Sequence, residues 1–367
     1  MMQTIIPWGD PKAQMKWGSQ LAVDTNTAGY FTKKFEGKGD NNIIEQKTEL
    51  EGDTGDRVSF DLSVQLRGKP TTGDDRVTGK EESLRFYTDQ VIIDQTRKSV
   101  SAGGKMSRKR TVHDLRKVAK ARLAEYWAKY MDELKFIYLS GMRGINEDFI
   151  EPEDWTGHAG NAIQPPDAQH VFYPGAVASK ATLTAADTMN RDVIEVVSSE
   201  SKMMRAQDPK TANMKPVTVE GEDHYVVVMS PFQERDMRTA VGATGWLEIS
   251  KAAAGAEGRA SKIFKGGLGM INNVILHCHE SVVRARDYGA GSNVHAARAL
   301  FLGRQAGVIA YGTSGGARFS WFEDKIDGDN EPIVIAGTIV GMKATVFNGK
   351  RFGTIAIDTA AKSARAA

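Results

Sequence analysis

Apolar side chains recur at intervals of three or four positions along one stretch of the second hundred residues. They belong to Val112, Leu115, Ala119, Leu123, Tyr126, Tyr130, Leu134 and Ile137. At 100° per residue these positions form a single narrow stripe, which predicts an amphipathic helix over residues 111–139. Ala121 and Ala128 fall on the opposite side, where we expect solvent.

The ends of this helix carry their own signals. Thr111 followed by Asp114 is a capping pair, and Gly141 can end the helix. A helix of about 29 residues is ~43 Å long at 1.5 Å per residue. The average helix of a globular protein has about three turns. The fold must therefore accommodate one long element laid along one side of the molecule.

A hairpin with a long polar tip precedes the helix. Val58, Phe60, Leu62, Val64 and Leu66 alternate with polar residues, which is the period of a half-buried strand. A second strand-like run covers residues 84–93, so the hairpin spans residues 57–93. Its tip, residues 67–83, is longer than the 12–15 residues beyond which loops are usually functional or disordered.

The remaining pattern predicts an α+β fold with β-elements near both ends of the chain. Residues 1–45 have scattered large apolar residues and little periodicity, which is typical of a terminal arm that needs a partner to become ordered. We expect helices over 185–206 and 231–241, and strands over 225–229, 274–279, 333–335, 338–346 and 354–357, with 299–311 as a strand or short helix. Asn348-Gly349 is the preferred two-residue hairpin turn.

Composition excludes several classes of protein. The 367 residues suggest two or three lobes at about 150 residues per domain. With 48 Lys and Arg against 46 Asp and Glu, the chain is too balanced to grip a polyanion with its whole surface. One cysteine, Cys278, excludes a disulfide framework and a multi-cysteine zinc site. The first residues resemble no signal peptide and no apolar run approaches ~20 residues, so we expect a soluble protein from a reducing interior with no membrane partner.

Candidate chemical motifs are weak. Residues 312–316 match a nucleophile elbow around Ser314, but the last histidine precedes that serine and a strand-like run follows it. His277 and His279 would share one face of a strand, yet two ligands do not make a structural zinc site. Residues 327–330 lack the spacing of a calcium loop and are predicted to form a turn. We therefore predict no catalytic residue, no cofactor and no metal, and the protein is not expected to be an enzyme.

A basic cluster lies at the start of the predicted helix. It consists of Arg108, Lys109, Arg110, Arg116, Lys117 and Lys120. Three interpretations remain open: a solvated helix flank, a phosphate contact, or a surface complementary to an acidic neighbour such as the cluster within residues 147–154.

Several short runs together resemble one family. They are TAGYFTKKF at 27–35, GDNNIIE at 39–45, GDRVSFDL at 55–62, SAGG at 101–104, RKRT at 108–111 and GINE at 144–147. In this order they are similar to the major capsid proteins of tailed bacteriophages, whose fold was first described for the Hong Kong phage. The resemblance covers nearly the whole chain.

The resemblance implies a division of the chain. It implies an N-terminal arm at 1–45, an extended hairpin called the E-loop at 46–100, a peripheral domain at 101–216 that contains the long helix, an axial domain at about 217–330, and strands at 331–367 that return to the peripheral domain. The charged residues of the E-loop tip are then candidates for a subunit interface. They are Arg67, Lys69, Asp74, Asp75, Arg76, Lys80, Glu81 and Glu82.

The implied function is structural. The chain would self-assemble into pentamers and hexamers of an icosahedral head around double-stranded DNA, which it would contact without sequence specificity. A portal protein and scaffold or decoration proteins would be further partners, and the shell would assemble in the bacterial cytoplasm and persist in the virion. An encapsulin-like protein compartment is the alternative.

Overall fold

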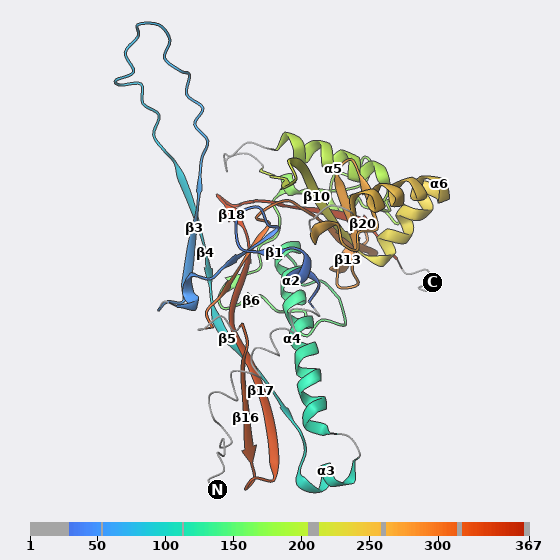
Figure 1. Ribbon diagram of the computed structural model, residues 1–367. Coiled ribbons are helices and arrows are strands. Elements are labelled where there is room, and N and C mark those ends of the chain that lie inside the picture. The colour runs from blue at the N-terminus through green and yellow to red at the C-terminus, as the bar shows by residue number, and fades with distance from the viewer. Residues whose placement is uncertain are drawn as a thin grey trace.

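The computed structural model describes residues 29–52, 54–111, 114–204, 213–257, 262–313 and 318–362. Most of the expected N-terminal arm, residues 1–28, and the candidate nucleophile Ser314 lie outside these ranges. Figure 1 shows an elongated molecule with a hairpin projecting at one end, a long helix beside a ribbon of strands at the other, and a lobe of sheet and helices to one side.

The long helix of the fold is α4 (Leu115–Ser140), preceded by a separate short helix, α3 (Lys105–Arg110). The expected helix 111–139 therefore begins four residues late, because Asp114 is itself the N-cap and accepts hydrogen bonds from the backbone N–H groups of Arg116 and Lys117. Its end agrees with expectation, since Gly141 takes the left-handed conformation with φ 71°.

The burial of α4 changes along its length. Its first half is amphipathic, with Leu123 buried and Ala121 exposed, whereas every residue from Tyr130 to Ser140 is buried. The expectation that Ala128 faces solvent is wrong, because its side chain is only 6% exposed. The second half of the helix is enclosed on all sides, so a single stripe does not describe it.

One sheet flanks α4. It has the order β1-β2-β15-β17-β16, with β5 also paired to β17. Its strands are β1 (Glu36–Gly37), β2 (Ile44–Lys47), β5 (Asp94–Ser101), β15 (Gly307–Tyr311), β16 (Ser320–Ile326) and β17 (Glu331–Ala344). The inward positions of β17, among them Val334, Ala336 and Val340, are buried in the same core as α4. Alternation along β17 thus covers one face of the ribbon with the helix.

A second sheet of eight strands forms the side lobe. It contains β8 (Val171–Phe172), β9 (Val217–Val219), β10 (Glu222–Met229), β11 (Gly269–Ile271), β12 (Val274–Cys278), β13 (Arg284–Tyr288), β14 (Val294–Leu302) and β20 (Thr354–Ala360). Along β10, Val226 and Val228 join the α4 core, while Tyr225, Val227 and Met229 join a second core. That second core lies against α5 (Arg191–Met203) and α6 (Pro231–Glu257). Burial of both faces explains the continuous apolar run at 225–229.

The two sheets do not follow the boundary at residue 330 that was expected between an axial domain, 217–330, and C-terminal strands, 331–367. β15 and β16 belong to the sheet of β17, whereas the C-terminal β20 pairs with β14 in the eight-stranded sheet. The four residues 303–306 between β14 and β15 carry the chain from one sheet to the other. The expected element 299–311 is therefore two strands in two sheets.

The remaining elements are short. The expected helix 185–206 is α5, which begins later because Asn190 caps it. α6 contains a break at Gly242, with φ 75°, where the expected helix 231–241 ends. Small hairpins are formed by β6 (Gly157–His158) with β7 (Asn161–Ala162), and by β18 (Val346–Phe347) with β19 (Lys350–Arg351), the latter around the expected Asn348-Gly349 turn. The 3₁₀ helices are Glu49–Glu51, Ala168–His170, Lys180–Thr182 and Lys262–Phe264.

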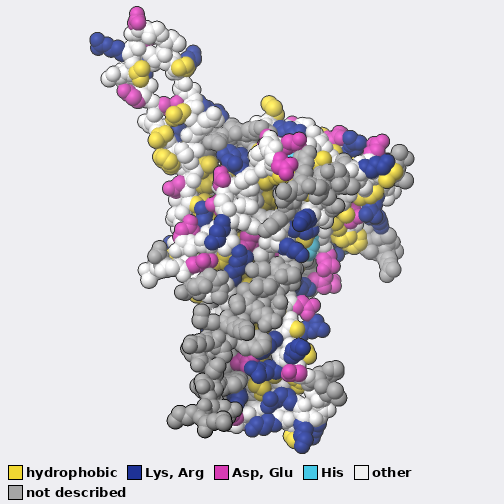
Figure 2. All heavy atoms as spheres, viewed as in Figure 1, with side chains coloured by type: hydrophobic (Ala, Val, Ile, Leu, Met, Phe, Trp, Pro, Cys, Tyr) yellow, Lys and Arg dark blue, Asp and Glu magenta, His cyan; other side chains and the backbone are white. Residues whose placement is uncertain are grey.

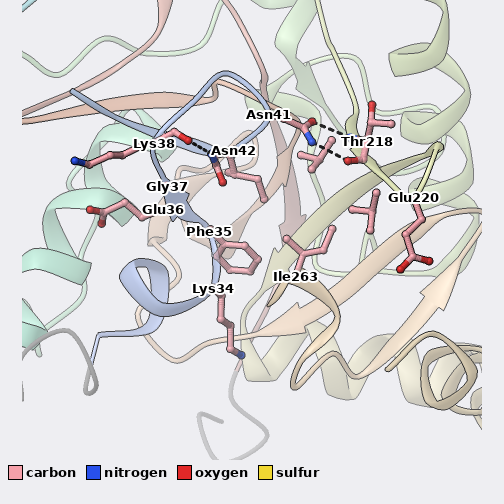
Figure 3. Close-up of a pocket in the computed structure, with 13 residues that line it drawn as sticks. Lys34, Phe35, Glu36, Gly37, Lys38, Asn41, Asn42, Thr218, Glu220 and Ile263 are labelled. Carbon is pink, nitrogen blue, oxygen red and sulfur yellow. Dashed lines mark hydrogen bonds between the residues drawn. The ribbon is translucent and has the colours of Figure 1, made fainter. Parts of the chain in front are cut away.

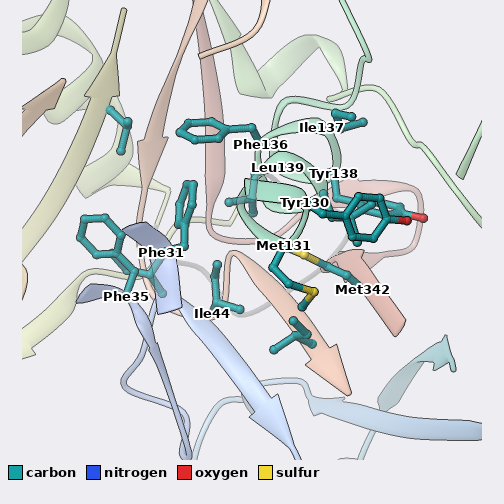
Figure 4. Packing of buried hydrophobic residues seen from close by; sticks show 14 of the residues in the cluster. Phe31, Phe35, Ile44, Tyr130, Met131, Phe136, Ile137, Tyr138, Leu139 and Met342 are labelled. Atoms are coloured by element: carbon teal, nitrogen blue, oxygen red, sulfur yellow. The ribbon is translucent and has the colours of Figure 1, made fainter. Parts of the chain in front are cut away.

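The described part of the expected arm, which begins at residue 29, packs into the core. Helix α2 (Tyr30–Lys34) is capped by Asp132 of α4, whose carboxylate accepts the backbone N–H groups of Tyr30 at 2.5 Å and Phe31 at 3.0 Å. Figure 4 shows the rings of Phe31 and Phe35 among the side chains of the α4 core. This part of the expected arm is thus a folded element of the subunit.

Candidate functional site: assembly surfaces

The projecting hairpin consists of β3 (Arg57–Ser63) and β4 (Phe86–Ile92), which pair in register from Arg57 opposite Ile92 to Ser63 opposite Phe86. Residues 64–85 form the tip, without helix or strand, and extend away from the body (Figure 1). Loop residues that stand clear of their own subunit are available to another molecule.

Two glutamate carboxylates of the tip accept hydrogen bonds from the backbone of the same loop. The Glu82 carboxylate accepts the backbone N–H groups of Arg67 and Gly68, the latter at 2.6 Å. These two backbone hydrogen bonds lower the pKa of Glu82 although the side chain is exposed. Gly79 donates its backbone N–H to Glu81 at 2.8 Å. Two of the predicted interface carboxylates thus act first on the loop's own backbone.

The other charged tip residues are exposed. Lys80 and Asp75 form an ion pair at 3.0 Å. Lys69, Asp74 and Arg76 are also exposed. The structure therefore brings the eight predicted residues together on one loop, and part of their charge is engaged within it.

Large apolar side chains stand out on the same hairpin, and Figure 2 shows them along it in yellow. Leu66 is 55% exposed, Val77 63%, Leu84 63% and Phe86 58%. A cluster of exposed large apolar residues marks an interaction surface more reliably than scattered charge does. Of these four residues, only Val77 lies within the expected tip 67–83. The sequence signal for this apolar surface was the alternating run that ends at Leu66, together with Leu84 and Phe86 just after the expected tip.

The basic cluster at the start of α4 divides into two groups. Arg116 and Lys120 both pair with Glu323 of β16, Lys120 at 2.9 Å. Burial raises the pKa of Glu323, but the hydrogen bonds and charges of these two cations lower it overall. Arg108 donates to the carbonyl oxygen of Asn330 at 3.1 Å. These three residues thus hold α3 and α4 against the β16–β17 hairpin of the same subunit.

The second group consists of Lys109, Arg110 and Lys117, which are exposed. The acidic segment 147–154 lies near the other end of α4, where Glu133 of the helix accepts the backbone N–H groups of Ile150 and Glu151. The acidic partner found for the cluster is therefore Glu323, which the sequence analysis missed because it is about two hundred residues away.

The candidate chemical motifs that lie within the described residues make hydrogen bonds that stabilise the fold. His277 on β12 is fully buried and hydrogen-bonds the carbonyl oxygen of Ile263 at 2.9 Å. The 327–330 segment is a turn closed by Asn330, which donates its backbone N–H to the carbonyl oxygen of Asp327. Within the described ranges, no cluster of three or more His, Cys, Asp or Glu side chains could hold a metal ion. No helix among those residues is long and apolar enough to cross a bilayer.

A pocket of about 500 Å³ separates the segment 34–43 from β9 (Figure 3). The Asn41 side chain closes one side by a paired contact with the backbone of Thr218, donating at 2.7 Å and accepting at 3.0 Å. Lys34, Lys38 and Glu220 contribute charge to its walls. Its described lining residues include no histidine, cysteine or serine.

Comparison with known proteins decides the family. A family model described as phage capsid protein matches residues 5–363. This chain belongs to that family. It is similar to the capsid of Ralstonia phage GP4, with 61% identity, complete coverage of both chains and a TM-score of 0.88. It is also 25% identical to the major capsid protein of Pseudomonas phage KPP25, over 94% of each chain.

More distant capsids share the fold. The capsid subunit of cyanophage Pam1 is 21% identical, with a TM-score of 0.69 over 89% of this chain and 91% of its own. The predicted α+β phage capsid fold and the predicted structural role in a virion shell are confirmed. An encapsulin-like compartment, the alternative raised from the sequence, is not favoured, because the family match and the relatives with high coverage are phage capsid proteins.

Proposed function

We propose that this chain is the repeating subunit of an icosahedral phage head, in which pentamers and hexamers are joined through the hairpin tip. The observation that carries the proposal is the projecting tip. Four large apolar side chains around it are more than half exposed, although burying such a side chain contributes about 1.5–3 kcal/mol. A second copy of the chain supplies the surface that the subunit itself does not.

Charge on the tip suits the same role. Mixed charges at the rim of an interface fix its register more than they raise its affinity. The internal bonds of Glu81 and Glu82 hold the backbone in shape, which reduces the entropy lost on docking. We thus assign affinity to the apolar residues and register to exposed charges such as Asp74 and Arg76.

The test compares two replacements of residues 68–82. A short Gly-Ser turn removes both the reach and the side chains, whereas a Gly-Ser segment of the same length keeps the reach. We expect the short variant to give folded, soluble subunits that form no closed shells, as judged by electron microscopy with circular dichroism melting as the control for folding. The same-length variant keeps Leu66, Leu84 and Phe86 and should form shells less well than the parent chain. Normal shells from the short variant would refute the proposal.

Point variants separate affinity from register. Leu84→Ser with Phe86→Ser should abolish shells, whereas reversing Asp74 and Asp75 to Lys should weaken assembly. Neither pair should lower the melting temperature of the subunit, because all four side chains are exposed. Shells that tolerate the serine pair would assign the contact to the charged residues instead.

We infer that the exposed group of the basic cluster contacts the packaged double-stranded DNA. Lys109 and Arg110 lie on α3 and Lys117 lies in the first turn of α4, elements that Figure 1 places at the end of the molecule opposite the hairpin. Their side chains are exposed, and the described residues form no ion pair with them. Phosphate contacts of this kind carry no sequence information. They make affinity fall with salt, with a slope of about 0.9 per phosphate neutralised.

A matched pair of variants tests this contact. Lys109→Gln with Arg110→Gln should reduce the salt slope of duplex DNA binding by up to about two units. Arg191→Gln with Arg286→Gln removes the same charge from exposed positions of the side lobe and should leave the slope unchanged. Equal slopes for the two variants would contradict the contact.

Other partners follow from the proposed function. A head of this kind requires a portal protein and can require scaffold or decoration proteins, and we place its assembly in the cytoplasm of the bacterial host. Co-expression of the subunit with each partner, followed by microscopy of the particles, tests these assignments.

A further inference from the structure

Two histidines lie beneath the helix at which the N-terminal segment enters the body. The ring of His279 lies between two rings, with centroids 4.4 Å from Tyr30 of α2 and 5.0 Å from Phe136 of α4. The ring of His277 meets Phe35, the residue after α2, edge to face at 5.2 Å. Helix α2 therefore rests on imidazole rings as well as on apolar side chains.

The surroundings of both rings favour the neutral form, through burial in each case. His279 Nδ1 accepts the backbone N–H of Ser281 at 3.1 Å, so a proton on this nitrogen would break the bond. His277 bonds the carbonyl oxygen of Ile263 through Nε2, which must carry the hydrogen because a carbonyl only accepts. Its Nδ1 is buried without a partner in the described structure, so protonation there would create an unpaired buried charge.

The charged groups around the pair come from three elements. Lys34 of α2 disfavours a positive charge on either ring, while Asp132 of α4 and Glu280, which follows His279, favour one on His279. Burial is the largest influence on both rings. It lowers the pKa of His277 to about 4 and lowers that of His279 from its ordinary value. Lys34 also lies 4.7 Å above the ring of Tyr30, so the same cation contacts the helix that the rings support.

We propose that His277 and His279 form an acid-operated latch: their protonation releases α2 from the body of the subunit. Departure of α2 removes part of the burial that disfavours a positive charge on the two rings, so protons bind the released state more tightly than the docked state. The docked state is favoured above the ordinary histidine pKa of about 6.5. It loses stability as the pH falls from there towards 4, by up to about tenfold in the equilibrium for each pH unit and each proton taken up.

Hydrogen exchange of the purified full-length subunit tests the latch. Pulses of deuterium at pH 7, 6, 5 and 4.5, corrected for intrinsic exchange rates, should show loss of protection in the peptide covering residues 29–36 below pH 6. A peptide from β14 should stay protected. The amides of Tyr30 and Phe31, which donate to Asp132, report the opening of α2 directly.

Variants assign the effect to the two rings. His277→Gln with His279→Gln removes both titrating groups but retains an amide that can donate to Ile263 and one that can accept from Ser281. This variant should keep α2 protected down to pH 4.5. His295→Gln, at an exposed position on β14, should behave as the parent chain.

Two results would overturn the proposal. One is protection of residues 29–36 that does not change with pH in the parent chain. The other is the same loss of protection in the double variant, which would assign the transition to carboxylates such as Asp132. Should the double variant fail to fold, His279→Gln alone is decisive: it must reduce the loss of protection between pH 6 and 5, and an unchanged profile refutes the latch.

Discussion

Asp358 of β20 is the centre of a buried polar cluster, and replacing it tests how the C-terminal strand is fixed. Its side chain is 1% exposed and binds Arg298 of β14 in a two-point contact, from Nε and Nη2, each at 2.7 Å. The hydroxyl of Tyr288 donates to it at 2.8 Å. Arg298 also donates to the carbonyl oxygen of Ser140, the last residue of α4. The cluster thus joins three sheet strands, β13, β14 and β20, to the end of the long helix.

Asp358→Asn leaves the guanidinium of Arg298 buried without its counter-charge. Breaking a buried ion pair by removing one partner destabilises a protein by about 3–5 kcal/mol, out of a typical total of 5–15 kcal/mol. We expect a loss of that size in urea unfolding followed by circular dichroism. Arg298→Met with Asp358→Leu removes both charges and should lose less than the single variant. The reasoning is refuted by a single variant that loses under about 1 kcal/mol, or by a double variant that loses more than the single.

Three further variants probe α4 by the same urea unfolding assay, and a fourth, at Asp167, probes acid unfolding. Leu123→Ala should lose about 2–5 kcal/mol by leaving a cavity, while Ala121→Ser on the exposed side should change stability by less than about 0.5 kcal/mol. Gly141→Ala should lose about 1–3 kcal/mol, because φ is 71° and an added Cβ would lie 2.4 Å from a backbone oxygen. Burial raises the pKa of Asp167, but hydrogen bonds led by that of the His170 ring lower it overall to about 2. Its contribution is therefore present above the ordinary pKa of 3.8 and lost as the pH falls through about 2, and Asp167→Asn should remove that part of the acid unfolding curve.

Local signals in the sequence were enough for α4, β3 and the β18–β19 hairpin. The stripe through Leu123 and Tyr130, the capping residue Asp114 and the stop at Gly141 located α4 within a few residues of its observed bounds. The alternation from Val58 to Leu62 located β3, and the Asn348-Gly349 turn located the small β18–β19 hairpin. Each of these signals acts over a few residues, so a single sequence contains it.

The pairing of distant strands had no such signal. Residues 299–311 were expected to form one element, yet they contain the end of β14 and all of β15, which belong to different sheets. The same limit applied to the site. Glu323 is more than two hundred residues from Arg116, and neither segment carries a sequence pattern that predicts the ion pair between them. Burial of both faces of β10 also removes the alternation that would have shown which side faces which core.

The topology makes the hairpin and the side lobe parts of one cooperative unit. β2 near the start of the described chain pairs with β15, and β20 near its end pairs with β14. Both α4 and Asp132-capped α2 lie in the core that these sheets share. Contacts so far apart in sequence close only when most of the chain is in place. Among the described residues, the hairpin tip makes no such contacts, so it can shift as a unit without disturbing the core. A shell subunit needs this combination, a body that stays rigid and a projecting arm that can adapt to differently placed neighbours in pentamers and hexamers.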